Sequence, residues 1–186
     1  MKADVNKLAY IGKKPGDGNS KRDSDSWFTP ELYTDMVRKV LGGIDLDPFS
    51  SEPANQHVKA ERYFDINRDA FKQTWFEDSG TVFMNPPYSR ELIEKSVNIF
   101  LLNLTNNSIS QAIVLVNNAT ETKWFQTLSD PADAICLVNK RIPFENIDGK
   151  HTSGNTRGQI FLYYGSNKGV FKSVFKNIGS IFTPTK

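Results

Sequence analysis

The spacing of apolar side chains divides the chain into a polar N-terminal segment and a body of short alternating elements. Residues 1–25 have no hydrophobic period, and we interpret them as a flexible arm before a single domain over residues 26–186. Within that domain, apolar residues spaced three and four apart predict helices, and short apolar runs between turn residues predict strands. The chain is long enough for such a domain to bury a substantial core.

The predicted elements alternate along the chain. Helices are expected over residues 30–41, 92–104 and 122–128, a weak helix or a loop over residues 54–60, and strands over residues 44–49, 63–64, 81–84, 111–116, 134–138 and 159–164. Thr29 is a good residue to cap the first helix, and Pro30 fits its first position. This order predicts an α/β fold with a mostly parallel sheet and helices on both faces. The last strand is expected to be antiparallel, because no obvious helix separates it from the strand before it.

The tetrapeptide Asn85-Pro86-Pro87-Tyr88 stands where the predicted strand 81–84 ends and the next helix begins. Ligands of open α/β sheets bind beyond the carboxyl ends of strands. Proline has no N–H, so the two prolines leave carbonyl oxygens as acceptors. An amide oxygen, a proline carbonyl and an aromatic ring form a receptor for a planar group with an exocyclic amine, such as adenine. The plain alternative is a turn in which Pro-Pro ends the strand.

Acidic residues follow two other predicted strands. Asp47, nearer the strand end than Asp45, could face a cofactor that carries an ammonium group and a sulfonium centre. Asp69, followed by Ala70-Phe71, offers a carboxylate to an adenine amine beside a ring for stacking, and Asp65 could reach ribose hydroxyls. As alternatives, Asp before Pro commonly starts a turn, and Asp69 could cap a helix.

Composition and charge restrict the functional classes. No apolar run approaches the ~20 residues that span a bilayer, so no membrane segment is expected. One cysteine, Cys136, cannot form a disulfide within the chain and is expected in a buried strand, which favours the reducing cytoplasm. His57 and His151 lack metal-ligand spacing, so no metal is expected. Neither a Walker loop nor GxGxxG is present, which argues against nucleotide hydrolysis and ordinary NAD binding.

Positive charge is concentrated at the two ends of the chain. Residues 1–22 carry six Lys or Arg and two acids, residues 149–186 carry six and none, and residues 23–148 carry eleven against nineteen acids. This asymmetry is expected of an acidic cofactor-binding body flanked by basic segments that meet phosphates. A solvated basic tail is the alternative.

Taken in order, the motifs resemble the phage-type DNA N6-adenine methyltransferases, a family related to Dam-like enzymes. The resemblance covers roughly residues 26–165. The matching segments are Trp27–Pro30, Asp45–Ser50, Arg62–Phe64, Asp69–Phe71 with Trp75, Asn85–Tyr88, Asn118–Thr120, Thr122–Phe125, Ile135–Cys136 and Arg141–Phe144. Two departures stand out: Pro48–Ser51 replaces the usual glycine-rich turn, and Ala70 stands where the family tends to have Gly.

The resemblance implies a Rossmann-like fold that uses S-adenosylmethionine (AdoMet), double-stranded DNA as the partner, and the host cytoplasm if a phage encodes the protein. It assigns cofactor contacts to Trp27, Thr29, Asp47 and Asp69, and catalysis to Asn85, Pro86, Pro87 and Tyr88. Beside this motif, the polar loop 140–158 is expected to contact DNA through its basic residues, Lys140, Arg141, Lys150 and Arg157.

The expected chemistry is methylation of a flipped adenine. Asn85 and the Pro86 carbonyl would each accept one N6–H, so that the nitrogen lone pair points at the methyl group, while Tyr88 stacks on the base. If stacking is the role of Tyr88, Phe should replace it and Ala should not. The tetrapeptide alone also fits methylation of RNA adenine or of a glutamine amide, and a non-catalytic DNA-binding protein on this scaffold is the third alternative.

Overall fold

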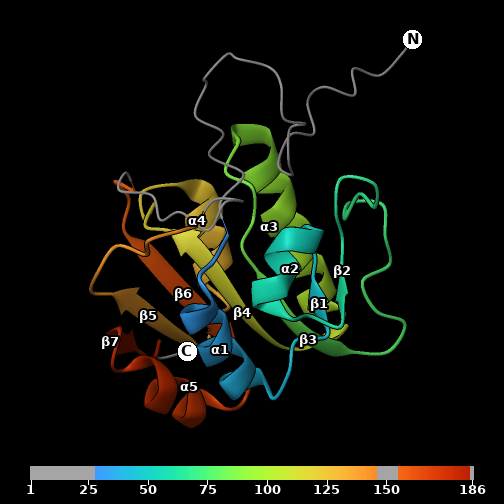
Figure 1. Ribbon diagram of the computed structural model, residues 1–186. Helices are drawn as coiled ribbons and strands as arrows, with labels where there is room; N and C mark the ends of the chain where they lie inside the picture. Colours follow the sequence, from blue (N-terminus) through green and yellow to red (C-terminus); the bar gives the residue numbers. More distant parts are fainter. Residues whose placement is uncertain (1–27, 146–154, 185–186) are drawn as a thin grey trace, which may run out of the picture.

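The computed structural model describes residues 28–145 and 155–184, and all its strands join one sheet (Figure 1). The sheet order is β2-β1-β3-β4-β6-β5-β7. The strands are β1 (Leu46–Asp47), β2 (Arg62–Tyr63), β3 (Gly80–Met84), β4 (Ile109–Asn117), β5 (Ala134–Val138), β6 (Gln159–Tyr164) and β7 (Gly179–Phe182). The helices are α1 (Glu31–Leu41), α2 (Glu52–Val58), α3 (Arg90–Thr105), α4 (Lys123–Ser129) and α5 (Lys168–Phe175).

Strand directions confirm the predicted mixed sheet. β1 pairs in parallel with β2 and β3, and β3 pairs in parallel with β4. β6 lies antiparallel between β4 and β5, so β5 points the same way as β4. The carboxyl ends of β1 to β5 therefore meet at one edge of the sheet, and the loop before β6 begins at that same edge.

Two apolar layers cover the sheet, one on each face, because successive strand side chains point to opposite faces. One layer packs Val37 of α1 and Phe171 of α5 against Phe83 and Phe161. The other packs Phe100 of α3 and Leu128 of α4 against Met84 and other strand residues. Helices on both faces explain why β3, β4 and β6 are apolar along almost their whole length.

The C-terminal region departs from the prediction. Gln159–Tyr164 forms a strand as expected, but it is not the last element, because α5 and β7 follow it. β7 pairs antiparallel with β5. Buried Phe171 and Phe175 hold α5 against the sheet, so packing rather than a strong local signal makes this short helix.

The start of α1 also differs from the prediction. Pro30 rather than Thr29 is its capping residue, and no side chain caps the helix. Thr29 is buried, with 4% of its surface exposed, and its hydroxyl is directed elsewhere, toward Asn85. The predicted arm over residues 1–25 lies outside the described residues.

Cys136 is fully buried in β5, as predicted. Burial raises the pKa of its thiol to about 12. A thiol with so high a pKa stays protonated near neutral pH, so Cys136 is a packing residue rather than a nucleophile.

Candidate active site

The carboxyl ends of β1 and β3 bring two of the predicted site segments together. These strands are neighbours, with Leu46 opposite Val82. Asp47 is the last residue of β1, and Asn85 directly follows β3. Backbone geometry therefore places the carboxylate segment and the Asn-Pro-Pro-Tyr segment side by side at one edge of the sheet.

The Asn85 carboxamide is held between two side chains. Its Nδ2 donates to Thr29 Oγ1 at 3.4 Å, and its Oδ1 lies 3.4 Å from the Tyr88 hydroxyl. Both distances are at the long end for hydrogen bonds. A carbonyl oxygen has two lone pairs, so Oδ1 can accept a second donor from a substrate. The Thr29 hydroxyl does not cap α1, so it is available to accept the hydrogen bond from Asn85.

Tyr88 is anchored through its hydroxyl as well as placed by its ring. The hydroxyl accepts the Asn117 backbone N–H at 3.0 Å. Its single proton can go to Asn85 Oδ1 or to the Leu115 carbonyl oxygen, each at 3.4 Å. The ring is only partly buried, whereas Pro86 and Pro87 are buried. The tyrosine therefore links the end of β3 to the end of β4.

Asp47 is a buried carboxyl with few partners. It is 3% exposed, and Oδ1 accepts the Phe49 backbone N–H at 3.2 Å. Burial raises its pKa from 3.8 to about 7, against the lowering effects of that N–H and of the Ser50 hydroxyl. Ser50 Oγ is itself buried and forms no hydrogen bond of good geometry within the described residues. No ion pair compensates Asp47 there, so a bound cation would stabilise its ionised form.

Asp45, two residues earlier, forms structural hydrogen bonds with Thr81. Its Oδ2 accepts the Thr81 backbone N–H at 2.7 Å, and its own N–H donates to Thr81 Oγ1 at 3.0 Å. These bonds fasten β1 to the start of β3. Asp47 rather than Asp45 therefore stays the proposed ligand residue.

Asp69 lies in a turn rather than at a helix start. Its Oδ1 accepts the Phe71 backbone N–H at 3.1 Å, and Lys72 Nζ lies 3.4 Å from Oδ2. The Phe71 ring packs on Phe49, with centroids 5.5 Å apart. This contact places the Asp69 turn beside the loop that follows Asp47, and it gives that side of the site two aromatic faces.

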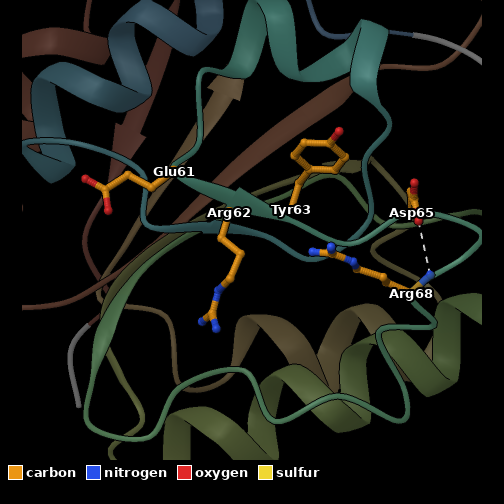
Figure 2. A pocket seen from close by; sticks show the side chains of 5 residues that line it. All are labelled: Glu61, Arg62, Tyr63, Asp65 and Arg68. Carbon is orange, nitrogen blue, oxygen red and sulfur yellow. Dashed lines mark hydrogen bonds between the residues drawn. The ribbon is translucent and has the colours of Figure 1, made fainter.

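A pocket of about 230 Å³ flanks the end of β2, lined by Glu61, Arg62, Tyr63, Asp65 and Arg68 (Figure 2). Tyr63 and Arg62 point to opposite sides of the strand. The Asp65 carboxylate accepts the Arg68 backbone N–H at 3.1 Å. The pocket is smaller than the 300–1,000 Å³ typical of ligand sites, and its charges are balanced. We therefore interpret it as a rim beside the site.

The predicted basic loop starts and ends at the same sheet edge. The Asn118 N–H donates to the Gly158 carbonyl at 2.8 Å, and Phe28 and Glu145 exchange backbone hydrogen bonds. Lys140, Arg141 and Arg157 are exposed, and none of the three forms an ion pair within residues 28–145 and 155–184. Trp27 and Lys150, also predicted as site residues, lie outside the described residues.

Comparison with protein families agrees with this arrangement. A family model described as DNA N-6-adenine-methyltransferase (Dam) matches residues 17–180. The chain belongs to this Dam family. The match spans most of the chain, including every site segment above. A search of curated proteins gives no match.

Membership of the Dam family confirms the predicted family and its activity class, methylation of DNA adenine. Among the described residues, no group of three or more His, Cys, Asp or Glu could hold a metal ion. None of the described helices is long and apolar enough to cross a membrane.

Two polar residues at this edge were not predicted from the sequence. Asn117 ends β4 and Gln159 begins β6, and their side chains are hydrogen-bonded at 3.2 Å. Asn117 ends an apolar strand, as Asn85 follows one, and this shared position is the signal that could have identified it. Gln159 carries no comparable signal, because its partner is set by strand pairing.

Proposed function

We propose that this Dam-family protein transfers a methyl group from AdoMet to N6 of an adenine flipped out of double-stranded DNA. The observation that carries the proposal is the position of the Asn85 carboxamide, which contacts Thr29 and Tyr88 and lies beside two buried prolines. Its Oδ1 can still accept a hydrogen bond from a substrate. An amine with two N–H groups is the substrate that such a set of acceptors recognises.

The residues around Asp47 fit the charge of AdoMet. Within residues 28–145 and 155–184, the buried Asp47 carboxyl has no ion-pair partner and the buried Ser50 hydroxyl has no hydrogen bond of good geometry, and this pair suits an ammonium group next to a sulfonium. Asp69 and Asp65 supply acceptors for adenine and ribose, and Phe49 and Phe71 supply apolar faces. Thr29 is proposed to border both the cofactor and Asn85. When bound, AdoMet would supply an electrophilic methyl group, and transfer of that group to nitrogen would convert the sulfonium to a neutral thioether.

Asn85 and Pro86 are proposed to prepare the attacking nitrogen. The adenine amine is a weak nucleophile because its lone pair is delocalised into the ring. Acceptance of one N6–H by Asn85 Oδ1 and the other by the Pro86 carbonyl would draw the nitrogen toward tetrahedral geometry and free the lone pair. The same acceptors would stabilise the positive charge that develops on N6, which then loses one proton to solvent water. Positioning supplies much of the remaining rate gain.

The Tyr88 hydroxyl contacts change the expected effect of its substitution. Tyr88→Phe keeps the ring but removes the contact to Asn85 Oδ1 and the acceptor for the Asn117 N–H. We expect kcat to fall about tenfold, which corresponds to the loss of the one hydrogen bond that orients Asn85, with the KM for DNA little changed. Tyr88→Ala should also raise the KM for DNA, because it removes base stacking.

Tyr163→Phe is the matched control for that series. Its hydroxyl donates to Gln111 Oε1 at 2.7 Å at the opposite edge of the sheet. Steady-state kinetics with duplex DNA should show full kcat for Tyr163→Phe. Full kcat for Tyr88→Phe as well would show that the hydroxyl does not position Asn85.

The basic loop is proposed to bind DNA phosphates. Each phosphate contact contributes about −0.9 to the slope of log K against log salt concentration. The double variant Arg141→Gln, Arg157→Gln should therefore flatten the slope by up to about 1.8 and weaken binding at low salt. The matched control neutralises two exposed lysines on helices, Lys39→Gln and Lys95→Gln. Equal slopes for the two double variants would remove the loop from the interface.

Methylation of an RNA adenine or a glutamine amide would use the same acceptors. Parallel assays with labelled AdoMet and duplex DNA, RNA or a mixed protein extract separate these substrates. We expect incorporation into DNA. Exclusive labelling of RNA or protein would reassign the substrate, and the absence of AdoMet binding would favour a non-catalytic DNA-binding protein.

A further inference from the structure

The first residue of β6 carries a buried side-chain amide whose polar atoms are all used. Gln159 is 2% exposed. Its Nε2 donates to Asn117 Oδ1 at 3.2 Å, and its Oε1 accepts from the Ile142 backbone N–H at 3.3 Å and from Asn155 Nδ2 at 3.0 Å. One side chain thus joins the end of β4 to the two described limbs of the basic loop, residues 140–145 and residues 155–158.

Asn155 completes the connection between the two limbs. Its Nδ2 also donates to the Ile142 carbonyl at 3.0 Å, and its Oδ1 accepts the Arg157 backbone N–H at 3.1 Å. The Ile142 side chain is fully buried next to these bonds. We call Asn117, Asn155 and Gln159 the amide clamp. It fixes the segments that carry Lys140, Arg141 and Arg157.

The same clamp reaches the catalytic segment through Asn117. The side chain of Asn117 binds Gln159, and its backbone N–H binds the Tyr88 hydroxyl. Tyr88 in turn contacts Asn85 Oδ1. Hydrogen bonds from the side chain and from the backbone of Asn117 therefore connect the basic loop with the carboxamide proposed to hold the target amine.

The position of the clamp in the sheet argues against a purely structural role. Along the six registered pairs of β4 and β6, five join apolar or aromatic residues, and only Asn117–Gln159 joins two amides. A buried amide costs free energy unless it is fully hydrogen-bonded, and an apolar pair would fill this place with less risk. The polar pair lies at the edge that carries Asn85 rather than at the opposite edge.

We propose that Gln159 is a positioning residue for DNA methylation, acting with Asn155 to hold residues 140–145 and 155–158 in a fixed place relative to Asn85 and Tyr88. The inference rests on the proposed function, because the loop is assigned to DNA phosphates there. Phosphates bound by these residues would set the position of the duplex, and the clamp would hold that position relative to Asn85, which is proposed to bind the target amine.

Two variants release the loop in different ways. Gln159→Met keeps a side chain of similar length in the buried position but removes its hydrogen bonds. Asn155→Ala removes the hydrogen bonds between the two limbs of the loop, and it disturbs the core less because Asn155 is partly exposed. Each should raise the KM for duplex DNA about tenfold and flatten its salt dependence. Kcat at saturating DNA should fall less than threefold, and the AdoMet Kd should stay within twofold of wild type.

Gln111→Met is the matched control, because Gln111 is an amide on β4 that accepts from the Tyr163 hydroxyl near the opposite edge. Thermal unfolding of all variants shows whether each is folded. The proposal is overturned if Gln159→Met and Asn155→Ala lower the Tm but leave the KM for DNA equal to that of Gln111→Met. An inactive wild-type protein would instead contradict the proposed function, so the two failures are distinguishable.

Discussion

Asn85→Ala is expected to lower kcat for DNA methylation by at least about 100-fold while the AdoMet Kd stays within about threefold of wild type. Removing one preorganised polar group from a site that stabilises developing charge typically costs a factor of 10² to 10³. Asn85 Oδ1 is proposed to be such a group, and the carboxamide is oriented by contacts to Thr29 and Tyr88. Single-turnover kinetics and calorimetry measure the two quantities separately.

Asn85→Asp provides the closest comparison, because it keeps an acceptor oxygen in nearly the same place. Part of the activity should return with aspartate, since acceptance of an N6–H is the proposed role. Parallel loss of AdoMet binding and methylation in Asn85→Ala would indicate that the variant has lost its fold or that the assigned role is wrong. Far-ultraviolet circular dichroism decides between these two explanations.

Asp47→Asn is expected to stabilise the cofactor-free protein above pH 7 and to weaken AdoMet binding. A carboxyl whose pKa is raised by folding keeps its proton at pH values where the unfolded chain has released it. For Asp47 the pKa rises from 3.8 to about 7. The free energy of unfolding should therefore fall as pH rises from about 4 to about 7, and then level off. Since one pKa unit is about 1.4 kcal/mol, the loss is bounded at about 4 kcal/mol.

Asparagine removes this pH dependence together with the charge. Denaturant titrations from pH 4 to pH 8 should show a smaller slope for Asp47→Asn than for wild type. Calorimetry at pH 8 should show AdoMet binding weakened about tenfold or more, as expected when a charge-assisted hydrogen bond is lost. At pH 6, wild-type binding should release up to one proton, which is detected in buffers of different ionisation enthalpy.

Asp45→Asn is the matched control for Asp47→Asn. Asp45 belongs to the same strand segment, but its carboxylate binds the Thr81 N–H. Its replacement should leave AdoMet affinity unchanged. If Asp47→Asn binds AdoMet as tightly as Asp45→Asn does, then Asp47 is not a cofactor residue.

The strand positions and the site segments could be predicted because they depend on local pattern. The runs that form β3, β4 and β6 are apolar enough to require burial, and Asp47 and Asn85 stand directly at strand ends. In a parallel sheet, that position alone places them at one edge. The α5 and β7 elements were missed because α5 has eight residues and no capping side chain, so tertiary packing decides its formation.

The orientation of the site could not be predicted, because it depends on partners far apart in the sequence. Thr29 is a residue type that commonly caps helices, yet its hydroxyl accepts a hydrogen bond from Asn85, 56 residues away in the sequence. The Tyr88 hydroxyl meets Asn117, and Gln159 meets Asn117 across a strand pair. A motif gives the residue types at a site, whereas strand register decides which polar atoms face one another.

The site at Asn85 is proposed to direct a methyl group to N6 of adenine in DNA. The most direct measurement uses AdoMet with a trideuterated methyl group and mixed-sequence duplex DNA, followed by digestion to nucleosides and mass spectrometry. The account predicts deuterated N6-methyladenine with the wild-type protein and a loss of at least about 100-fold with Asn85→Ala. DNA whose adenines carry no deuterium after incubation with folded, AdoMet-binding protein would contradict it.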